Sequence, residues 1–67
     1  MTVEDLYRTV SHNQDIQLLN KTEHVEWNGE ADDIPIRYMY SWIMQIYPAN
    51  GTLVIIMDYP GHAISHL

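Results

Sequence analysis

Apolar residues near the start of the chain recur with the spacing of a helix. Four of them lie three, four and seven positions apart and would share one face: Val3, Leu6, Tyr7 and Val10. The Thr2 hydroxyl can cap the first turn, and the acids at positions 4 and 5 suit the positive end of a helix. The pattern predicts a helix over residues 3–11.

Two short strands are predicted next. Residues 15–20 form the first, although the Leu18-Leu19 pair interrupts strict alternation, and Lys21-Thr22 would make the following turn. The second strand alternates between positions 24 and 27. The polar side chains of positions 24 and 26 would face one side, and the apolar side chains of positions 25 and 27 the other.

The next segment carries turn and helix-start signals. Asn28-Gly29 predicts a turn, because both residues tolerate a positive φ angle. Glu30 to Asp33 would then be an acidic connector. Asp33-Ile34-Pro35 fits the entry to a helix, with a carboxylate near the first turn and a proline that the first turn tolerates.

Residues 36–47 fit two patterns. Positions 36, 39, 40, 43 and 47 keep helical spacing, whereas positions 42, 44 and 46 alternate as a strand would. The following residues favour a short helix over 35–41 and a strand over 42–47. Pro48-Ala49-Asn50-Gly51 has the composition of a hairpin connection, and residues 52–59 form the clearest strand in the chain. A strand before this turn completes the hairpin.

The last strand is apolar on both faces from Leu53 to Met57. An antiparallel strand with one face in water would alternate instead. The N-terminal helix can cover one face, but a chain of 67 residues can hardly supply a layer for the other, which indicates a homodimer. The predicted fold class is α+β, with the N-terminal helix packed on a small, mainly antiparallel sheet that ends in a C-terminal β-hairpin.

Size and composition fit one small folded domain. The chain has 67 residues, 46% of them hydrophobic, and no cysteine that could form a disulfide or a thiolate metal site. We expect a single domain over residues 1–59 and a loosely held tail over residues 60–67. The N-terminus has neither the basic nor the apolar region of a signal peptide. The longest apolar run is far shorter than the roughly 20 residues that span a bilayer, so we expect a cytoplasmic protein.

Acidic residues are concentrated in the middle of the chain, where no Lys or Arg lies between Lys21 and Arg37. Five of the nine acids fall within eleven residues: Glu23, Glu26, Glu30, Asp32 and Asp33. Such a stretch repels nucleic acid and attracts basic surfaces. It predicts a partner-binding surface that fits a basic groove, such as the nucleic-acid channel of a nuclease. The alternative is a solvated loop whose charges only keep the protein soluble.

Aromatic residues also gather in this part of the chain. Six rings lie within 33 residues, and we assign three of them to the partner-binding surface: Trp27, Tyr38 and Tyr40. Base stacking normally accompanies a basic track for the phosphate backbone, and the chain contains only three basic residues, Arg8, Lys21 and Arg37. The sequence therefore argues against direct nucleic-acid binding and favours core and interface roles for these rings.

Motifs of catalysis or cofactor binding are missing from the sequence. The serines lie outside nucleophile motifs, there is no phosphate-binding loop, and the glycines are isolated. His62 and His66 have the spacing of two metal ligands on a helix, but they lack the glutamate of the H-E-x-x-H motif and follow a Pro-Gly pair. We expect no enzymatic activity, no cofactor and no metal.

Three segments carry a resemblance to a known class of proteins. They are Thr2-Val3 with Leu6-Tyr7, the acidic Gly29 to Asp33 leading into Ile34-Pro35, and Gly51-Thr52-Leu53-Val54-Ile55. Together they resemble short acidic orphan proteins encoded in phages and mobile elements of Gram-positive bacteria. The resemblance implies a protein that binds and blocks a host protein, as anti-CRISPR inhibitors do, some of them at the DNA-binding surface of the effector.

These observations leave three functional hypotheses. The first is a non-enzymatic inhibitor that docks on a basic protein surface through its acidic stretch. The second is a self-assembling accessory protein, for which the strands and aromatic rings matter and the acids only solubilise. The third is a dimeric sponge for a small ligand such as a nucleotide. Binding that weakens steeply with salt would favour the first over the second, and stabilisation by a ligand would favour the third.

Overall fold

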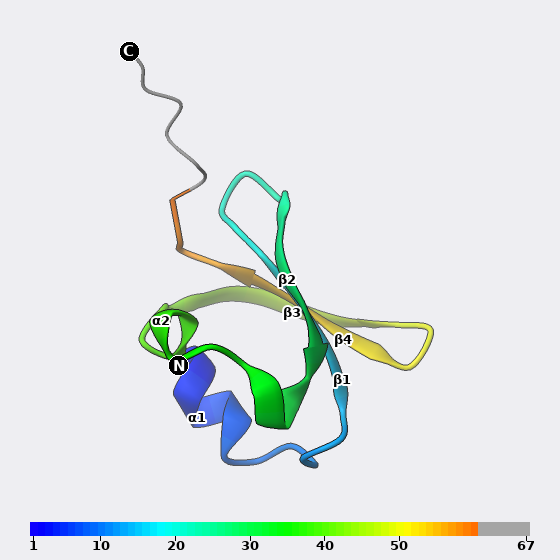
Figure 1. The fold of residues 1–67 in the computed structure, drawn as a ribbon. Coiled ribbons are helices and arrows are strands. Elements are labelled where there is room, and N and C mark those ends of the chain that lie inside the picture. Colours follow the sequence, from blue (N-terminus) through cyan, green and yellow to red (C-terminus); the bar gives the residue numbers. More distant parts are fainter. Residues whose placement is uncertain (61–67) are drawn as a thin grey trace.

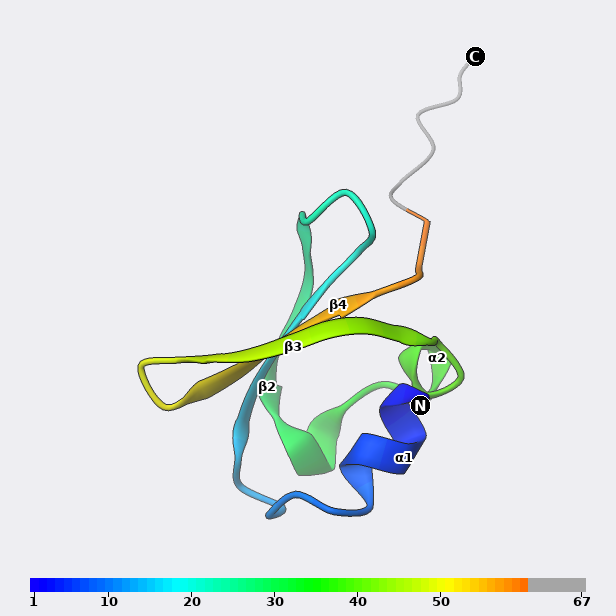
Figure 2. The ribbon, with the colours of Figure 1, turned by 180° about the vertical axis from the view of Figure 1, so that it is seen from behind.

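The computed structural model describes residues 1–60, which form a four-stranded sheet with short helices on one side (Figure 1, Figure 2). The strand order is β2-β1-β4-β3, with β1 and β4 parallel and the other two pairs antiparallel. This arrangement confirms the predicted α+β class. The elements in chain order are α1 (Val3–Tyr7), β1 (Asp15–Leu19), β2 (Val25–Glu30), the 3-10 helix η1 (Ala31–Asp33), α2 (Ile36–Met39), β3 (Ile43–Ala49) and β4 (Thr52–Met57).

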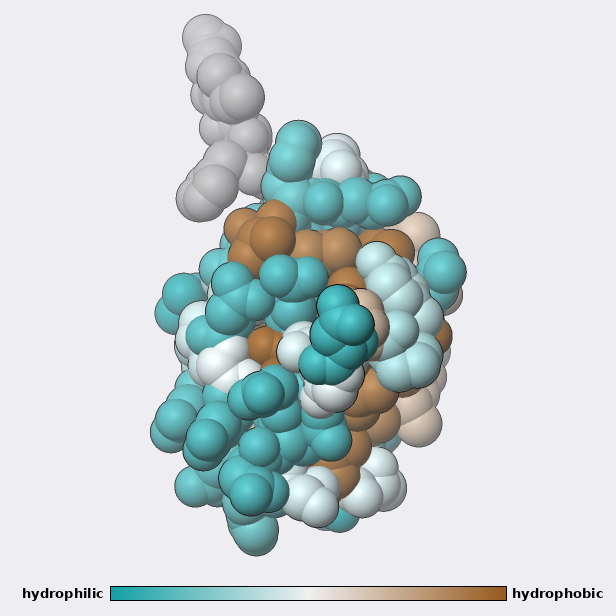
Figure 3. Space-filling view, turned by 90° about the vertical axis from the view of Figure 1, so that its right-hand side faces the viewer, coloured by the Kyte–Doolittle hydropathy of each residue, from teal (hydrophilic) through white to brown (hydrophobic). Residues whose placement is uncertain are grey.

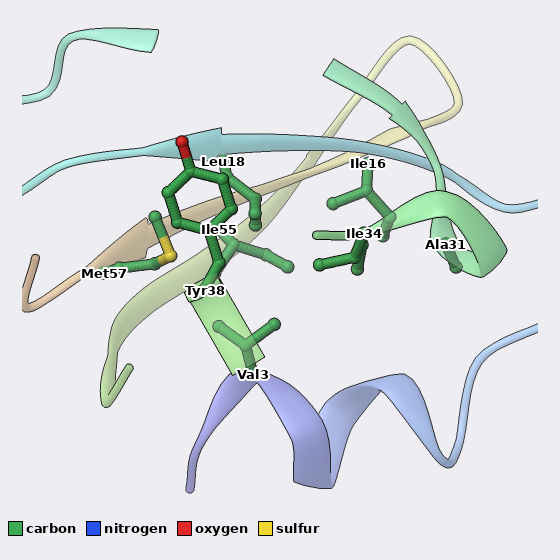
Figure 4. Packing of buried hydrophobic residues seen from close by; sticks show 8 residues of the cluster. All are labelled: Val3, Ile16, Leu18, Ala31, Ile34, Tyr38, Ile55 and Met57. Carbon is green, nitrogen blue, oxygen red and sulfur yellow. The ribbon is translucent and has the colours of Figure 1, made fainter. Parts of the chain in front are cut away.

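The hydrophobic core lies between the sheet and the helices. Alternate residues of the two central strands point into it, including Ile16 and Leu18 from β1 and Ile55 and Met57 from β4 (Figure 4). The helical side contributes buried residues from three segments: Val3, Ala31, Ile34 and Tyr38. The remaining members of the predicted helix stripe are half-buried against the same cluster, so the predicted packing of the N-terminal helix on the last strand is confirmed.

The opposite face of the sheet, here called the outer face, has its own small apolar cluster. Leu19, Val54 and Ile56 are buried on it and pack with Ala49. Within residues 1–60 no helix or second sheet covers this face, as Figures 1 and 2 show from opposite sides. The last strand, β4, is apolar on both faces because it is a central strand whose side chains pack in the core on one face and in the small outer cluster on the other.

Helix α1 is shorter than predicted. The Thr2 amide donates to Asp5 Oδ2 at 2.9 Å and the Asp5 amide donates to Thr2 Oγ1 at 3.3 Å, which forms the expected cap and lowers the pKa of the Asp5 carboxyl. The helix ends at Tyr7 and not at residue 11. The Thr9 hydroxyl donates to the Leu6 carbonyl at 2.8 Å, a local bond that competes with continuation of the helix.

The predicted C-terminal hairpin is present, with changed boundaries. Residues 35–47 are not one helix, because α2 is a single turn and β3 pairs with β4. The loop contains only Asn50 and Gly51, with φ angles of 53° and 83° that fit a type I′ turn. Pro48 and Ala49 therefore belong to β3 and not to the turn, and β4 ends at Met57, two residues earlier than predicted.

The turn predicted at Asn28-Gly29 was wrong. Both residues lie inside β2, where they pair with Gln17 and Ile16. The turn predicted at Lys21-Thr22 is confirmed: the chain reverses between β1 and β2 at residues 20–24, where Glu23 has a φ angle of 65°. Asn20 Oδ1 organises this reversal, because it accepts hydrogen bonds from the Thr22 amide, the Thr22 hydroxyl and the His24 amide. A side chain and not a glycine makes this turn.

Position 29 of β2 has no room for a side chain, which explains its glycine. A Cβ atom placed on it would lie 2.5 Å from Cζ2 of the Trp27 ring. We expect Gly29→Ala to destabilise the protein by about 1–3 kcal/mol, because the methyl group must displace a half-buried ring. Urea unfolding measures this cost. In a Trp27→Ala background the same change should cost little, and an equal cost in both backgrounds would contradict the explanation.

Candidate acidic binding surface

The acidic stretch does not fold into one surface. Glu23 lies in the β1–β2 turn, whereas Glu30, Asp32 and Asp33 lie at the other end of β2. A strand of six residues separates the two groups by roughly 20 Å. Five acids that are close in sequence are therefore divided between the two ends of the sheet.

Glu26 points toward the protein and not toward solvent. One carboxylate oxygen accepts a hydrogen bond from Asn20 Nδ2 at 3.0 Å, and the other accepts one from the Tyr38 hydroxyl at 3.2 Å. The Tyr38 side chain is only 2% exposed, and burial raises the pKa of its hydroxyl. This network joins the β1–β2 turn to α2, so Glu26 has a structural role.

The other three acids of the stretch lie together with an acid of β1 in what we call the acidic corner: Asp15, Glu30, Asp32 and Asp33. All four are exposed. Asp15 and Glu30 are direct neighbours in the β1–β2 pair, and the Asp32 amide donates to the His12 carbonyl at 3.0 Å, which holds η1 beside the start of β1. Sequence reasoning missed Asp15, because only the strand register brings it to this corner.

Basic side chains of the described region lie elsewhere. Arg8 pairs with Glu4 at 3.2 Å, and the Arg37 guanidinium lies 4.6 Å from the centre of the Tyr38 ring. Lys21 is at the β1–β2 turn, at the other end of the sheet. Within residues 1–60 the acidic corner makes one ion pair, between His12 Nδ1 and Asp32 Oδ1 at 3.2 Å, which is charged only when His12 is protonated. Its carboxylates face solvent without a Lys or Arg partner.

The three aromatic residues predicted for partner binding occupy different environments. Tyr38 is in the core, and the half-buried Trp27 packs against that core while its ring covers Gly29. Tyr40 is 76% exposed, but it follows α2, beside the N-terminus and away from the start of β1 (Figure 1, Figure 2). Of the eight predicted contact residues, only Glu30, Asp32 and Asp33 come together at the surface.

The structure contains no arrangement that points to metal binding in the described residues. No three His, Asp or Glu side chains within residues 1–60 lie close enough to share a metal ion. The negative charge of the acidic corner is thus spread over a surface and not focused on one point. His62 and His66 lie outside the described residues. No helix between residues 1 and 60 is long and apolar enough to cross a membrane.

The Tyr38–Glu26 contact predicts a pH dependence of stability. Because burial raises the pKa of Tyr38 above its ordinary value of 10.0, the folded protein keeps the phenolic proton at pH values where the unfolded chain loses it. The stability linked to this proton is complete below about pH 10 and is lost as the pH rises through the folded pKa. We expect Tyr38→Phe to cost about 1 kcal/mol at neutral pH and to flatten the alkaline decline. Urea midpoints at neutral and alkaline pH test this, and parallel curves for both proteins would contradict it.

Comparison of the chain with protein families, with curated proteins and with solved structures finds no match in any of the three.

Proposed function

We propose that this protein is a non-enzymatic binding protein that docks through its acidic corner on a basic surface of another protein. The observation that carries the proposal is the set of exposed carboxylates, Asp15, Glu30, Asp32 and Asp33, which no Lys or Arg of residues 1–60 pairs. Unpaired surface charge of one sign speeds and orients the approach of an oppositely charged partner.

The strand register adds a second argument. Asp15 and Glu30 lie directly opposite each other on the outer face, and like charges in that position destabilise a strand pair. A cation from a partner placed beside them would remove this repulsion. The chain is acidic overall, with a net charge of -6, so long-range attraction to a basic partner adds to the local effect.

The partner class follows from the resemblance to short acidic proteins of phages and mobile elements. We propose that the partner is a host protein with a nucleic-acid-binding surface, such as a defence nuclease in the host cytoplasm. Carboxylates at the acidic corner would occupy sites that otherwise hold phosphates, and the protein would act as an inhibitor by blocking them.

The experiment is affinity capture from a bacterial lysate with the wild-type protein and with a variant whose acidic corner is reversed in charge, followed by affinity measurements at low and high salt. A partner that binds nucleic acid, that the reversed variant fails to capture, and whose affinity falls steeply with salt supports the proposal. A partner held equally well by both proteins, with no salt dependence, would overturn it.

Self-association is the second candidate function, because the outer face exposes apolar surface. Val25 and Tyr47 are exposed near the buried outer-face cluster, and hydrophobic surface is visible on the side from which the β3–β4 loop projects (Figure 3). We expect a homodimer at micromolar concentration. Light scattering across that range measures the mass, and the mass of one chain throughout would argue against dimerisation.

A further inference from the structure

The sheet has two edge strands, β2 and β3, and they differ in whether another strand could pair with them. The edge of β3 is blocked at both ends. At its start, the Ile43 amide donates to the Met1 carbonyl at 2.9 Å and Thr2 forms a bridge with Trp42, so the N-terminal residues lie beside the first residue of the strand. Another strand cannot pair with this end of β3 unless the N-terminus moves.

Pro48 blocks the other end of the β3 edge. Ala49 and Thr52 flank a two-residue loop, where the flanking residues form a hydrogen-bonded pair. Pro48 precedes this pair, so its nitrogen points away from β4, toward the free edge. Proline has no amide hydrogen to offer an incoming strand, and proline on an edge strand protects against pairing.

The edge of β2 is open by comparison. The Ala31 amide donates to the Gln14 carbonyl at 2.9 Å, so the main-chain groups of Ala31 face β1. Along β2, residues whose main-chain groups face β1 alternate with residues whose groups face away. The amides of Gly29 and Trp27 then face β1, and the amide and carbonyl groups of Asn28 and Glu30 face away from it. Within residues 1–60 no chain atom accepts a hydrogen bond from these two outward amides, and both residues are exposed.

The side chains beside this edge decide which kind of strand can occupy it. Glu30 lies on it, Asp15 lies across from Glu30 on the same face, and Asp32 and Asp33 follow within three residues. β2 itself carries no Lys or Arg, the residue types that commonly blunt an exposed edge. A second copy of β2 would bring acidic side chains and no Lys or Arg to this edge, so it offers the acidic corner no opposite charge.

We propose that the β2 edge receives an extended, basic segment of the partner protein as a fifth strand, with main-chain hydrogen bonds to Asn28 and Glu30 and alternate Lys or Arg side chains on the acidic corner. The inference rests on the proposed function, because it specifies how the acidic corner engages a basic partner. Added strands of this kind gain affinity from the main chain and specificity from alternate side chains.

The first test uses a short synthetic peptide in which Lys and Val alternate, titrated into the full-length protein and followed by NMR. In the free protein, the amide hydrogens of Asn28 and Glu30 should exchange rapidly and those of Trp27 and Gly29 slowly. Bound peptide should slow exchange at Asn28 and Glu30 alone among these four. Exchange that stays rapid at both residues while the peptide is bound would overturn the proposal.

The second test separates strand addition from simple charge attraction. Two further peptides are methylated on backbone nitrogens, one at every Lys and the other at every Val. Both keep the charge of the parent peptide, and each lacks the main-chain amide hydrogens of one residue type. One of them should bind roughly tenfold more weakly and the other nearly as well as the parent, because only one set faces β2. Weak binding of the Lys-methylated peptide indicates an antiparallel fifth strand, and weak binding of the Val-methylated peptide a parallel one.

The outcomes distinguish the inference from the function on which it rests. If all three peptides bind equally and reversal of Glu30, Asp32 and Asp33 abolishes binding, strand addition is wrong and electrostatic docking stands. If a peptide with Glu in place of Lys binds as well as the parent, both are wrong.

Asn28→Pro provides a check from the protein side, because it removes one outward amide without changing the charge. It should weaken binding of the parent peptide, while thermal unfolding and circular dichroism stay close to those of the wild type.

Discussion

Replacing Ile55 with glutamate is expected to unfold the protein, whereas the same replacement at the adjacent Ile56 is expected to leave it folded. Ile55 is fully buried in the core between the sheet and the helices, and Ile56 lies on the outer face. The two changes are chemically identical and one residue apart, so their difference reports only which face each side chain occupies.

The energetic cost of Ile55→Glu, compared with the stability of the domain, explains why this variant should unfold. A domain of this size has a total stability of about 3–10 kcal/mol. An unpaired carboxylate in the core costs several kcal/mol even if it becomes protonated, and the lost packing of the isoleucine adds about 2–5 kcal/mol. Together these costs match or exceed the stability of the fold, and circular dichroism should show an unfolded chain.

Ile56 is only 6% exposed, but neighbouring side chains of the sheet cover it, since no helix or second sheet of residues 1–60 lies over the outer face. A glutamate at position 56 can turn its carboxylate out past these neighbours to water, so the cost should be limited to about 1–3 kcal/mol. If the outer face forms a homodimer, Ile56→Glu should yield a folded monomer by light scattering. An unfolded Ile56→Glu protein would show that this face is enclosed as tightly as the core.

Reversing the three acids of the corner, by Glu30→Lys, Asp32→Lys and Asp33→Lys, is expected to weaken partner binding by several kcal/mol. Each ion pair that loses contact with water contributes on the order of 1–2 kcal/mol, and the reversed charges repel the basic partner in addition. Association should slow, and the remaining affinity should no longer fall with added salt. Surface-binding kinetics at two salt concentrations measure both quantities.

A matched control separates position from net charge. Three reversals change the charge by three times +2, from -6 to 0. Reversal of Glu4, Glu23 and Asp58 gives the same net charge and leaves the acidic corner intact, with Glu23 and Asp58 at the other end of the sheet. The control should keep most of the affinity. Equal losses in both variants would show that total charge, and not the corner, determines binding.

Folding should hardly change in the variant with the reversed corner. Exposed acids contribute little to stability, and the pair between His12 and Asp32 is a surface contact. The sequence suggested that Asp33 also caps the short helix, but α2 begins after Pro35 and has no side-chain cap. Reversal at Asp33 is therefore not expected to carry the cost of a lost cap.

Local patterns in the sequence determined much of the secondary structure. Helical spacing with a capping threonine located α1, alternation located the strands, and Asn50-Gly51 supplied a turn whose φ angles only a few residue types accept. The apolar composition of β4 on both faces indicated that both faces are buried, and the strand order places β4 at the centre of the sheet. These features depend on neighbours along the chain, and the chain carries that information directly.

Tertiary structure decided the rest, because contacts between distant residues overrode local preference. Asn28-Gly29 has the composition of a turn, yet pairing with β1 and the Trp27 ring over Gly29 keep it in a strand. Strand register placed Asp15 beside Glu30 and turned Glu26 inward to Tyr38. The acidic stretch was evident in the sequence, but only the pairing of strands far apart in the chain determined which acids share a surface and which sheet edge they flank.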